Sequence, residues 1–295
     1  MGLERYEKRS IDMKIRDILK DNSPHVSFEV FPPKTDAGYE GVRAATEKIA
    51  ALRPSFISVT YGAGGGTSRN TVRIASQIKN DLGVTSLAHL TCVSSTKDEV
   101  HGVIGQLKEQ GIENILALRG DIPADGEFPL PNHYRYACEL VEDIKSQGDF
   151  CIGAACYPEG HVEAAHKKDD IMNLKHKVDC GVDFLTTQMF FDNEKYYAFV
   201  DRCRAEGITV PIIPGIKPIV FKNQLTVLPK IFRSDIPEPF ATELRKCKTD
   251  DEAKAVGVEW CIQQCKDLIA HGVPSLHFYT MMASDSVYKV AKEVY

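Results

Sequence analysis

The chain has 295 residues, of which 43% are hydrophobic and 26% charged, and its formal net charge is −5 at pH 7. This composition is typical of a globular protein with a large core, and the negative charge disfavours nucleic acid or an anionic membrane surface as its main partner. The charged start, MGLERYEKRS, is unlike a signal peptide, and no apolar run reaches membrane-spanning length, so we expect a cytoplasmic protein.

Nine cysteines, an odd number, are spread along the chain without any C-x-x-C pair. Several of them, such as Cys92 and Cys151, lie inside apolar runs. This distribution indicates reduced cysteines that pack in a core, and it favours neither a disulfide framework nor a metal site.

Eight short apolar runs, each bounded by glycine, proline or polar residues, predict β-strands. They span residues 25–33, 56–62, 86–93, 114–120, 150–158, 184–191, 210–219 and 275–280. Amphipathic helical patterns lie between them, and the longest interval, 220–274, is expected to hold extra helices.

Eight strands that alternate with helices predict an α/β protein with a (β/α)8 TIM barrel, forming a single domain over residues 1–295 with a flexible N-terminal extension at 1–13. An open doubly wound sheet is the competing architecture. It is disfavoured because no G-x-G-x-x-G motif follows the first strand.

Every predicted strand ends in a polar or ionisable side chain. In a barrel the carboxyl ends of all strands meet at one mouth, where the chemistry is located. One such residue would be a satisfied core group or a cap, but eight in phase indicate a large polar ligand. The residues are Glu29, Thr60, Tyr61, His89, Thr91, Arg119, Asp121, Tyr157, Glu159, His161, Gln188, Lys217 and Tyr279.

Glu29 lies between Phe28 and Phe31 at the end of the first strand. A carboxyl group in such an apolar position resists ionisation and can serve as a proton donor near neutral pH. The alternative is a buried glutamate paired with a lysine or arginine, and the residues alone leave both interpretations open. At the fourth strand, Gly120 is expected to let a ligand approach the backbone between Arg119 and Asp121.

Asp170, Asn173 and Lys177 form a polar stripe on the helix that follows the fifth strand. A solvated helix face is the ordinary interpretation of such a stripe. Its position directly after Tyr157 and His161 also allows it to contact the polar tail of a ligand. The glycine-rich loop at 62–68 matches no phosphate-binding motif and is expected to give backbone clearance beside a flat ligand.

Taken in order, the strand-end motifs resemble those of the methylenetetrahydrofolate reductase family of flavoenzymes. The motifs are SFEVFPPKT, VTYGAGGG, LAHLTCV, ILALRGD, AACYPEGH, DFLTTQMFFD, PIIPGIKPI and HFYT. The resemblance runs from about residue 14 to the end of the chain, which has the size of the bacterial single-domain form.

The resemblance implies a barrel that holds FAD, oxidises NADH or NADPH, and reduces 5,10-methylenetetrahydrofolate to 5-methyltetrahydrofolate by ping-pong kinetics. Glu29 matches the family's general acid, and Asp121 matches a carboxylate near the flavin and the pterin. Thr60, Gln188 and Gln224 match contacts to nicotinamide or folate. The implied flavin contacts are Tyr61, Ala63, His89, Arg119, Gly120, Asp121, Tyr136, Ala137, Tyr157, His161, Ala164, Asp170, Asn173 and Lys177.

The sequence departs from the family pattern at three positions. Ala283 stands where many relatives have an arginine for the glutamate tail of folate, and Lys217 is a candidate replacement by charge. His176 replaces an arginine, and Leu228 replaces an aromatic residue found near the nicotinamide in some relatives.

Two alternatives remain beside the reductase: the same barrel supplied by a protein electron donor, and a non-catalytic barrel that binds flavin or folate. The resemblance implies no metal ion, and it implies a homo-oligomer.

Overall fold

The structure is a computed structural model that describes residues 13–21, 23–33, 36–61, 65–93, 95–122, 128–164, 166–281 and 283–295. The expected extension at 1–13, apart from Met13, lies outside the described residues. Ala63, an expected flavin contact, also lies outside them.

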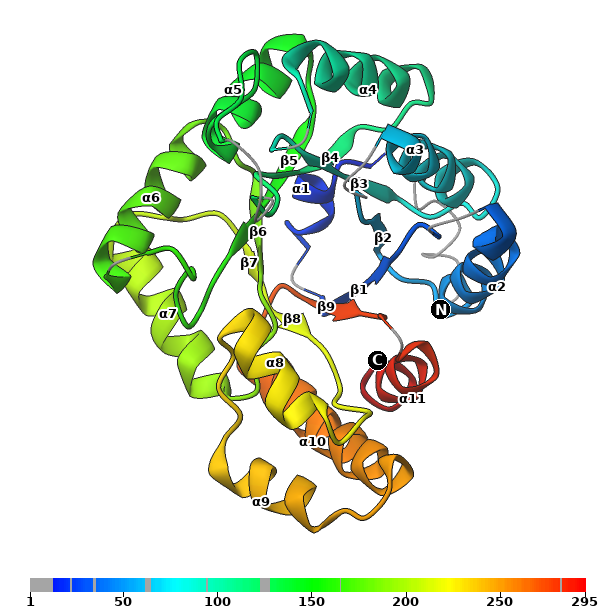
Figure 1. Ribbon diagram of the computed structural model, residues 1–295, viewed down its shortest axis with the longest axis vertical. Coiled ribbons are helices and arrows are strands. Elements are labelled where there is room, and N and C mark those ends of the chain that lie inside the picture. The colour runs from blue at the N-terminus through cyan, green and yellow to red at the C-terminus, as the bar shows by residue number, and fades with distance from the viewer. Residues whose placement is uncertain are drawn as a thin grey trace.

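Nine strands form one parallel sheet, in which neighbours follow the order β7-β6-β5-β4-β3-β2-β1-β9-β8. Figure 1 shows these strands as a ring surrounded by helices, which confirms the predicted (β/α)8 barrel. The strands are β1 (His25–Val30), β2 (Phe56–Val59), β3 (Ser86–Thr91), β4 (Asn114–Leu118), β5 (Cys151–Cys156), β6 (Phe184–Thr187), β7 (Ile212–Ile213), β8 (Gly215–Ile216) and β9 (Ser275–Tyr279).

The seventh predicted strand, 210–219, is divided into β7 and β8 by Pro214. β7 pairs with β6, whereas β8 pairs with β9, so this short stretch joins the two ends of the sheet and closes the ring. Proline has no N–H to donate, but its carbonyl remains available. The Pro214 carbonyl accepts from the His277 N–H at 3.0 Å, which continues the pairing across the break.

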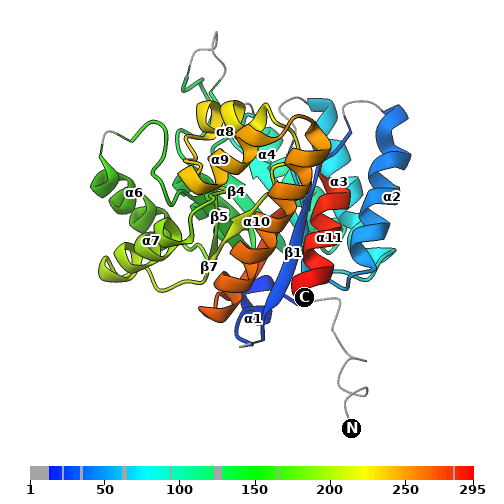
Figure 2. The same ribbon diagram turned by 90° about the horizontal axis from the view of Figure 1, so that it is seen from below.

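Helices cover the outside of the ring, as Figures 1 and 2 show. The interval 220–274 holds three of them, α8, α9 and α10, as expected. The helices are α1 (Ile15–Ile18), η2 (Asp36–Gly38), α2 (Tyr39–Ala50), α3 (Gly65–Asn80), α4 (Lys97–Glu109), α5 (Ala137–Gln147), α6 (Lys167–Asp179), α7 (Asn193–Ala205), α8 (Gln224–Phe232), α9 (Glu238–Lys246), α10 (Asp250–Ala270) and α11 (Ser284–Val294).

Toward the amino ends of the strands, β2 to β7 line the barrel interior with an apolar layer, whereas β1 and β9 contribute the polar Ser27 and His277 at the level of Phe56. Side chains from six strands form this layer, and all are buried: Phe56, Leu87, Leu116, Cys151, Phe184 and Ile213. Ile15 of α1 and Leu19, just after it, pack against the layer. Full burial of an aliphatic side chain such as Ile15 contributes roughly 1.5–3 kcal/mol. The first helix therefore closes this end of the barrel, and Figure 2 shows it there.

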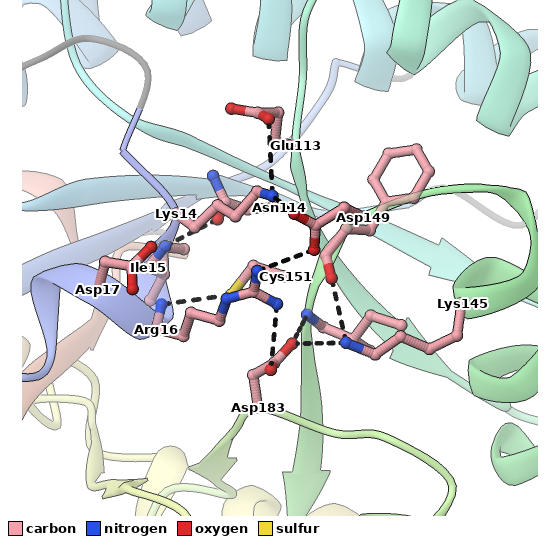
Figure 3. A network of polar contacts seen from close by, with 12 residues as sticks. Lys14, Ile15, Arg16, Asp17, Glu113, Asn114, Lys145, Asp149, Cys151 and Asp183 are labelled. Carbon is pink, nitrogen blue, oxygen red and sulfur yellow. Dashed lines mark hydrogen bonds and ion pairs between the residues drawn. The ribbon is translucent and has the colours of Figure 1, made fainter.

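Polar contacts fix α1 in this position (Figure 3). The backbone N–H of Ile15 donates to Asn114 Oδ1 at 2.8 Å. The Arg16 side chain donates to Asp149 at 2.8 Å and to Asp183 at 3.4 Å. The Arg16 N–H also points at the Cys151 sulfur at 3.3 Å. The N-terminal segment is thus bonded to residues at the amino ends of β4, β5 and β6.

Gly257 in α10 sets how closely this helix approaches the loop after β8. A Cβ atom at this position would lie 1.9 Å from the Ile219 carbonyl oxygen. We therefore expect Gly257→Ala to lower the free energy of unfolding by about 1–3 kcal/mol or more, because backbone must move to admit the methyl group. Urea unfolding measures this change.

Gly102 in α4 is the matched control, because a Cβ atom there would meet nothing within 4 Å. Gly102→Ala should raise the stability by roughly 0.5–1 kcal/mol, since alanine is the better helix former. Equal effects of the two substitutions would contradict the packing assigned to Gly257.

Candidate functional site

The upper half of the barrel interior, toward the carboxyl ends of the strands, is polar. Successive side chains of a strand point to opposite faces, so residues two apart share a face. Ser58 and His89 therefore lie directly above Phe56 and Leu87 of the apolar layer. Glu29 pairs in register with Ser58 on one side and with Tyr279 on the other. The fold thus places ionisable side chains directly above the apolar layer.

Glu29 is 6% exposed and is surrounded by imidazole groups. Its Oε2 lies 3.4 Å from His89 Nε2 and 4.0 Å from His277 Nε2. Its backbone carbonyl accepts from the Thr280 hydroxyl at 2.5 Å. Among the described residues no lysine or arginine forms an ion pair with the Glu29 carboxyl group.

His89 is a neutral imidazole in this environment. Burial lowers its pKa from 6.5 to about 4, against a smaller opposite effect of Glu29, and His277 lowers it further. Its buried Nε2 has no hydrogen-bond partner among the described residues. Buried polar atoms in proteins are nearly always bonded, so an orphan here indicates that a ligand or a bound water completes the site.

His277 of β9 is held by two serines, one from the neighbouring strand β1 and one from β2 beyond it. Its Nδ1 lies 2.8 Å from Ser27 Oγ and its Nε2 lies 3.4 Å from Ser58 Oγ. The sequence analysis did not select His277. It could have been found, because it precedes Tyr279 by two residues in HFYT and therefore shares its face of the strand.

A second group of predicted residues lies beyond β4 and β5. The Arg119 guanidinium donates to both carboxylate oxygens of Glu163, at 2.7 and 2.5 Å. The Tyr157 ring meets the His161 ring edge-on, with centroids 4.7 Å apart. Burial raises the pKa of Tyr157 to about 12, and the nearby Asp121 charge raises it while Arg119 lowers it. These five residues therefore share one electrostatic environment. Four of them were predicted from the sequence, whereas no sequence pattern indicated Glu163.

The three residues of the polar stripe on α6 do not all face the same surroundings. Asp170 Oδ2 accepts from the His161 N–H at 3.2 Å, and burial raises the pKa of the Asp170 carboxyl group. Lys177 donates to the Ala155 carbonyl at 2.7 Å, and burial lowers the pKa of its amine. Asn173 is exposed. Two members of the stripe thus turn toward β5 and one faces solvent.

The fold itself explains why residue 120 is a glycine. Its φ is +87°, and a Cβ atom would lie 2.8 Å from Val93 Cγ1. An L side chain is disfavoured in both respects. The glycine is therefore required by the turn itself, whether or not a ligand approaches its backbone.

The remaining predicted contacts lie around this region with less defined roles. Gln188 Oε1 accepts from the Met189 N–H at 2.9 Å, and Gln224 Oε1 accepts from the Val220 N–H at 2.7 Å, so both amides are bonded to backbone. Tyr136 is 49% exposed at the start of α5. The half-buried members of the predicted set are Thr60, Tyr61, Ala137 and Ala164.

Two clefts lie at the opposite, amino-terminal end of the barrel. The larger, of about 540 Å³, is lined by Lys14, Lys79 and Lys108 among others, and the smaller has about 380 Å³. The lysine side chains of the larger cleft already donate to Asp149, to the Gly111 carbonyl and to the Gln147 carbonyl. Neither cleft contains a predicted site residue.

Three further observations concern the cysteines, metal ions and membrane-spanning helices. All nine cysteines are free. In the described ranges no group of three or more His, Cys, Asp or Glu residues could hold a metal ion. No helix built from the described residues is long and apolar enough to cross a membrane.

Comparison with known proteins finds relatives along nearly the whole chain. Residues 14–295 match the family described as methylenetetrahydrofolate reductase. The chain is 38% identical over 267 residues to the 5,10-methylenetetrahydrofolate reductase of Pectobacterium carotovorum subsp. carotovorum, covering 90% of this chain and 88% of that protein. It is 35% identical over 287 residues to methylenetetrahydrofolate reductase (NADH) 1 of Arabidopsis thaliana, covering 92% of this chain and 48% of that longer protein.

Solved structures with low identity share the fold. A Clostridium thermocellum protein described as binding two copies of 5-methyl-5,6,7,8-tetrahydrofolic acid superposes with a TM-score of 0.66 at 16% identity, over 96% of this chain and 99% of that one. A 2,3-dimethylmalate lyase superposes with a TM-score of 0.55 at 10% identity, over 97% of this chain and 86% of that one.

The pKa of His89 predicts how stability depends on pH. Between pH 6.5 and about 4 the unfolded chain binds a proton that the folded imidazole rejects, so stability is lost as pH falls through this range. The loss at the acid end amounts to roughly 3 kcal/mol at most.

His89→Asn should remove this part of the pH dependence, as measured by urea unfolding at several pH values between 6.5 and 4. Above pH 6.5 the two proteins should differ by a constant amount. The same acid slope in both would show that His89 is protonated in the folded protein.

Proposed function

Because the chain belongs to the methylenetetrahydrofolate reductase family of oxidoreductases, we propose that it reduces 5,10-methylenetetrahydrofolate to 5-methyltetrahydrofolate. NADH or NADPH would supply the electrons, and a bound FAD would carry them in a ping-pong reaction. The observation that carries this proposal is the burial of Glu29 against His89 at the carboxyl end of the barrel, 3.4 Å from its Nε2.

The residues expected around a flavin fit such a group. His89 presents a buried, unpartnered Nε2 to the barrel mouth. Arg119, Tyr157 and His161 interact electrostatically with one another beyond β4 and β5, and Asp170 joins them through the His161 N–H. A guanidinium group suits phosphate oxygens, and flat rings suit an isoalloxazine. When bound, FAD would supply a two-electron carrier that accepts hydride from nicotinamide and delivers it to folate.

Glu29 is the proposed proton donor to N10 of the folate. A general acid must keep a proton away from bulk water until the substrate takes it. With 6% of its surface exposed and the His89 and His277 imidazoles at 3.4 and 4.0 Å, the Glu29 carboxyl group is shielded from bulk water, as this role requires. Protonation of N10 would open the five-membered ring of the folate and leave a cationic carbon at N5 for hydride to reach.

Asp121 is the proposed electrostatic partner of that cation. It follows β4, is exposed to the mouth, and acts on Tyr157 through space. A carboxylate there would favour positive charge on the folate and oppose negative charge on the cofactor.

The proposed electron donor is a nicotinamide cofactor. The Arabidopsis relative carries NADH in its name, which supports NADH over NADPH. A protein electron donor and a non-catalytic flavin- or folate-binding barrel are the alternatives. Residence in the cytoplasm and assembly into a homo-oligomer stay predictions.

An anaerobic titration tests the function. Protein purified with FAD should be yellow, should be bleached by NADH, and should regain its colour on addition of 5,10-methylenetetrahydrofolate. Colourless protein that takes up no FAD would support a non-catalytic barrel. Bleaching by dithionite but not by NADH or NADPH would support a protein donor, and colour that does not return with folate would exclude the reductase.

Glu29→Gln should abolish the return of colour with folate while leaving the bleaching rate with NADH within about threefold. The reason is that only the folate half-reaction needs a proton from this side chain. Loss of a positioned general acid lowers a rate by roughly 10²–10⁴-fold. Stopped-flow absorbance measures each half-reaction separately, and a parallel fall of both would show that Glu29 serves binding or folding instead.

Asp121→Asn should raise the reduction potential of the bound flavin, because the substitution removes a negative charge that opposes electron uptake. Equilibration with a reference dye under anaerobic conditions measures the potential. An unchanged potential would remove the electrostatic role, and wild-type folate rates would remove the catalytic one.

A further inference from the structure

Lys217 is a buried cation beside the proposed proton donor. It follows β8, in which Ile216 pairs with Phe278 of β9, so Lys217 stands level with Tyr279. Tyr279 in turn pairs with Glu29. Lys217 and Glu29 thus flank the same residue of β9 at the carboxyl end of the barrel. Only 4% of the lysine surface is exposed.

The ammonium group has few partners for such a position. Its Nζ donates to the Met281 carbonyl at 2.8 Å. An ammonium carries three donors, and burying a cation without acceptors is costly. No carboxylate of the described residues lies within ion-pair distance of Lys217, and Glu29 acts on it only through space. Among the described residues, one hydrogen bond is thus recorded for a cation that has three donors, at a site where 4% of its surface is exposed.

We propose that Lys217 is a substrate contact, which donates a hydrogen bond to an oxygen of the folate beside the reacting bond. This inference rests on the proposed function and adds a specificity-determining residue to it. Its binding partner is an uncharged or partly charged oxygen acceptor, such as a carbonyl of the pterin or benzoyl group.

The burial of Lys217 indicates which oxygen of the folate it would contact. The glutamate tail of a folate must leave the barrel toward solvent, whereas Lys217 is level with Glu29 inside the mouth. Its amine is also tied to the Met281 carbonyl, in the loop just after β9. Lys217 is therefore poorly placed to replace the arginine that relatives have at the position of Ala283, and the charge-based expectation is revised.

The protonation of the amine gives the contact a pH signature. Burial lowers the pKa of Lys217 to about 8, and Glu29 partly opposes this shift. Cys261 of α10 also acts on the charge of Lys217, and Tyr279 of β9 stands level with it. His89 and His277 lie beside Glu29. Burial holds the pKa of Tyr279 well above its usual value, and that of His89 lies near 4, so neither of them changes charge near pH 8. The ammonium donor is present below pH 8 and is lost as pH rises through it.

Lys217→Met is the main variant, with Lys217→Arg as the charge-retaining variant and Lys108→Met as the matched control. Replacing a buried charge by an apolar side chain of similar volume is usually tolerated, so Lys217→Met should fold. Lys108 is exposed at the opposite end of the barrel and also donates to a backbone carbonyl.

The measurements are KM and kcat for 5,10-methylenetetrahydrofolate, together with the rate of flavin reduction by NADH, from pH 6.5 to 9.5. Lys217→Met should raise the folate KM about 10- to 100-fold below pH 8, as expected for loss of a charged hydrogen bond, and leave the NADH rate unchanged. The wild-type KM should rise above pH 8. Lys217→Arg should keep a low KM at all these pH values, and Lys108→Met should behave as the wild type.

The outcomes separate this inference from the proposed function. A wild-type enzyme that does not reduce folate would overturn the function itself. A wild-type enzyme that does, combined with a Lys217→Met KM within twofold of it, would overturn only the role of Lys217. The tail-free substrate 5,10-methylenetetrahydropteroate should show the same KM ratio, and disappearance of the ratio would assign Lys217 to the tail and refute the proposed position.

Discussion

The chemistry of this protein depends on the apolar layer inside the barrel, which lies beneath the polar groups of the site. Phe56, Leu87 and Phe184 are fully or almost fully buried and belong to one apolar cluster inside the barrel. In such surroundings charges interact strongly and buried bases lose their protons, which is why the imidazole of His89 has a pKa near 4. If water entered this layer, the pKa of His89 would return toward its ordinary value.

The acid Glu29 lies among three basic side chains that come from different strands. Glu29 comes from β1, His89 from β3, His277 from β9, and Lys217 follows β8. Only barrel closure brings them together, and closure itself rests on the stretch around Pro214 that pairs with β6 before it and β9 after it.

The sequence predicted the barrel and most of the acid–base layer because both depend on periodicity. Apolar runs of similar length define strands, and the last polar residue of each run shares the mouth with the others, which located Glu29, His89 and Tyr279. Features that depend on three-dimensional packing were missed. The split of the seventh strand, the Arg119–Glu163 pair and the reason for Gly120 each involve contacts between segments that no local pattern records.

The position of α1 has a consequence for how the chain acquires its shape. This helix precedes all nine strands in the sequence, yet its neighbours in the barrel include Cys151, Phe184 and Ile213, which follow it at long sequence distance. It can therefore reach its final place only when most of the strands exist. Contacts between residues so far apart in sequence are typical of slow folding. Until then, the exposed Ile15 and the uncovered base of the barrel would be surfaces on which chaperones act.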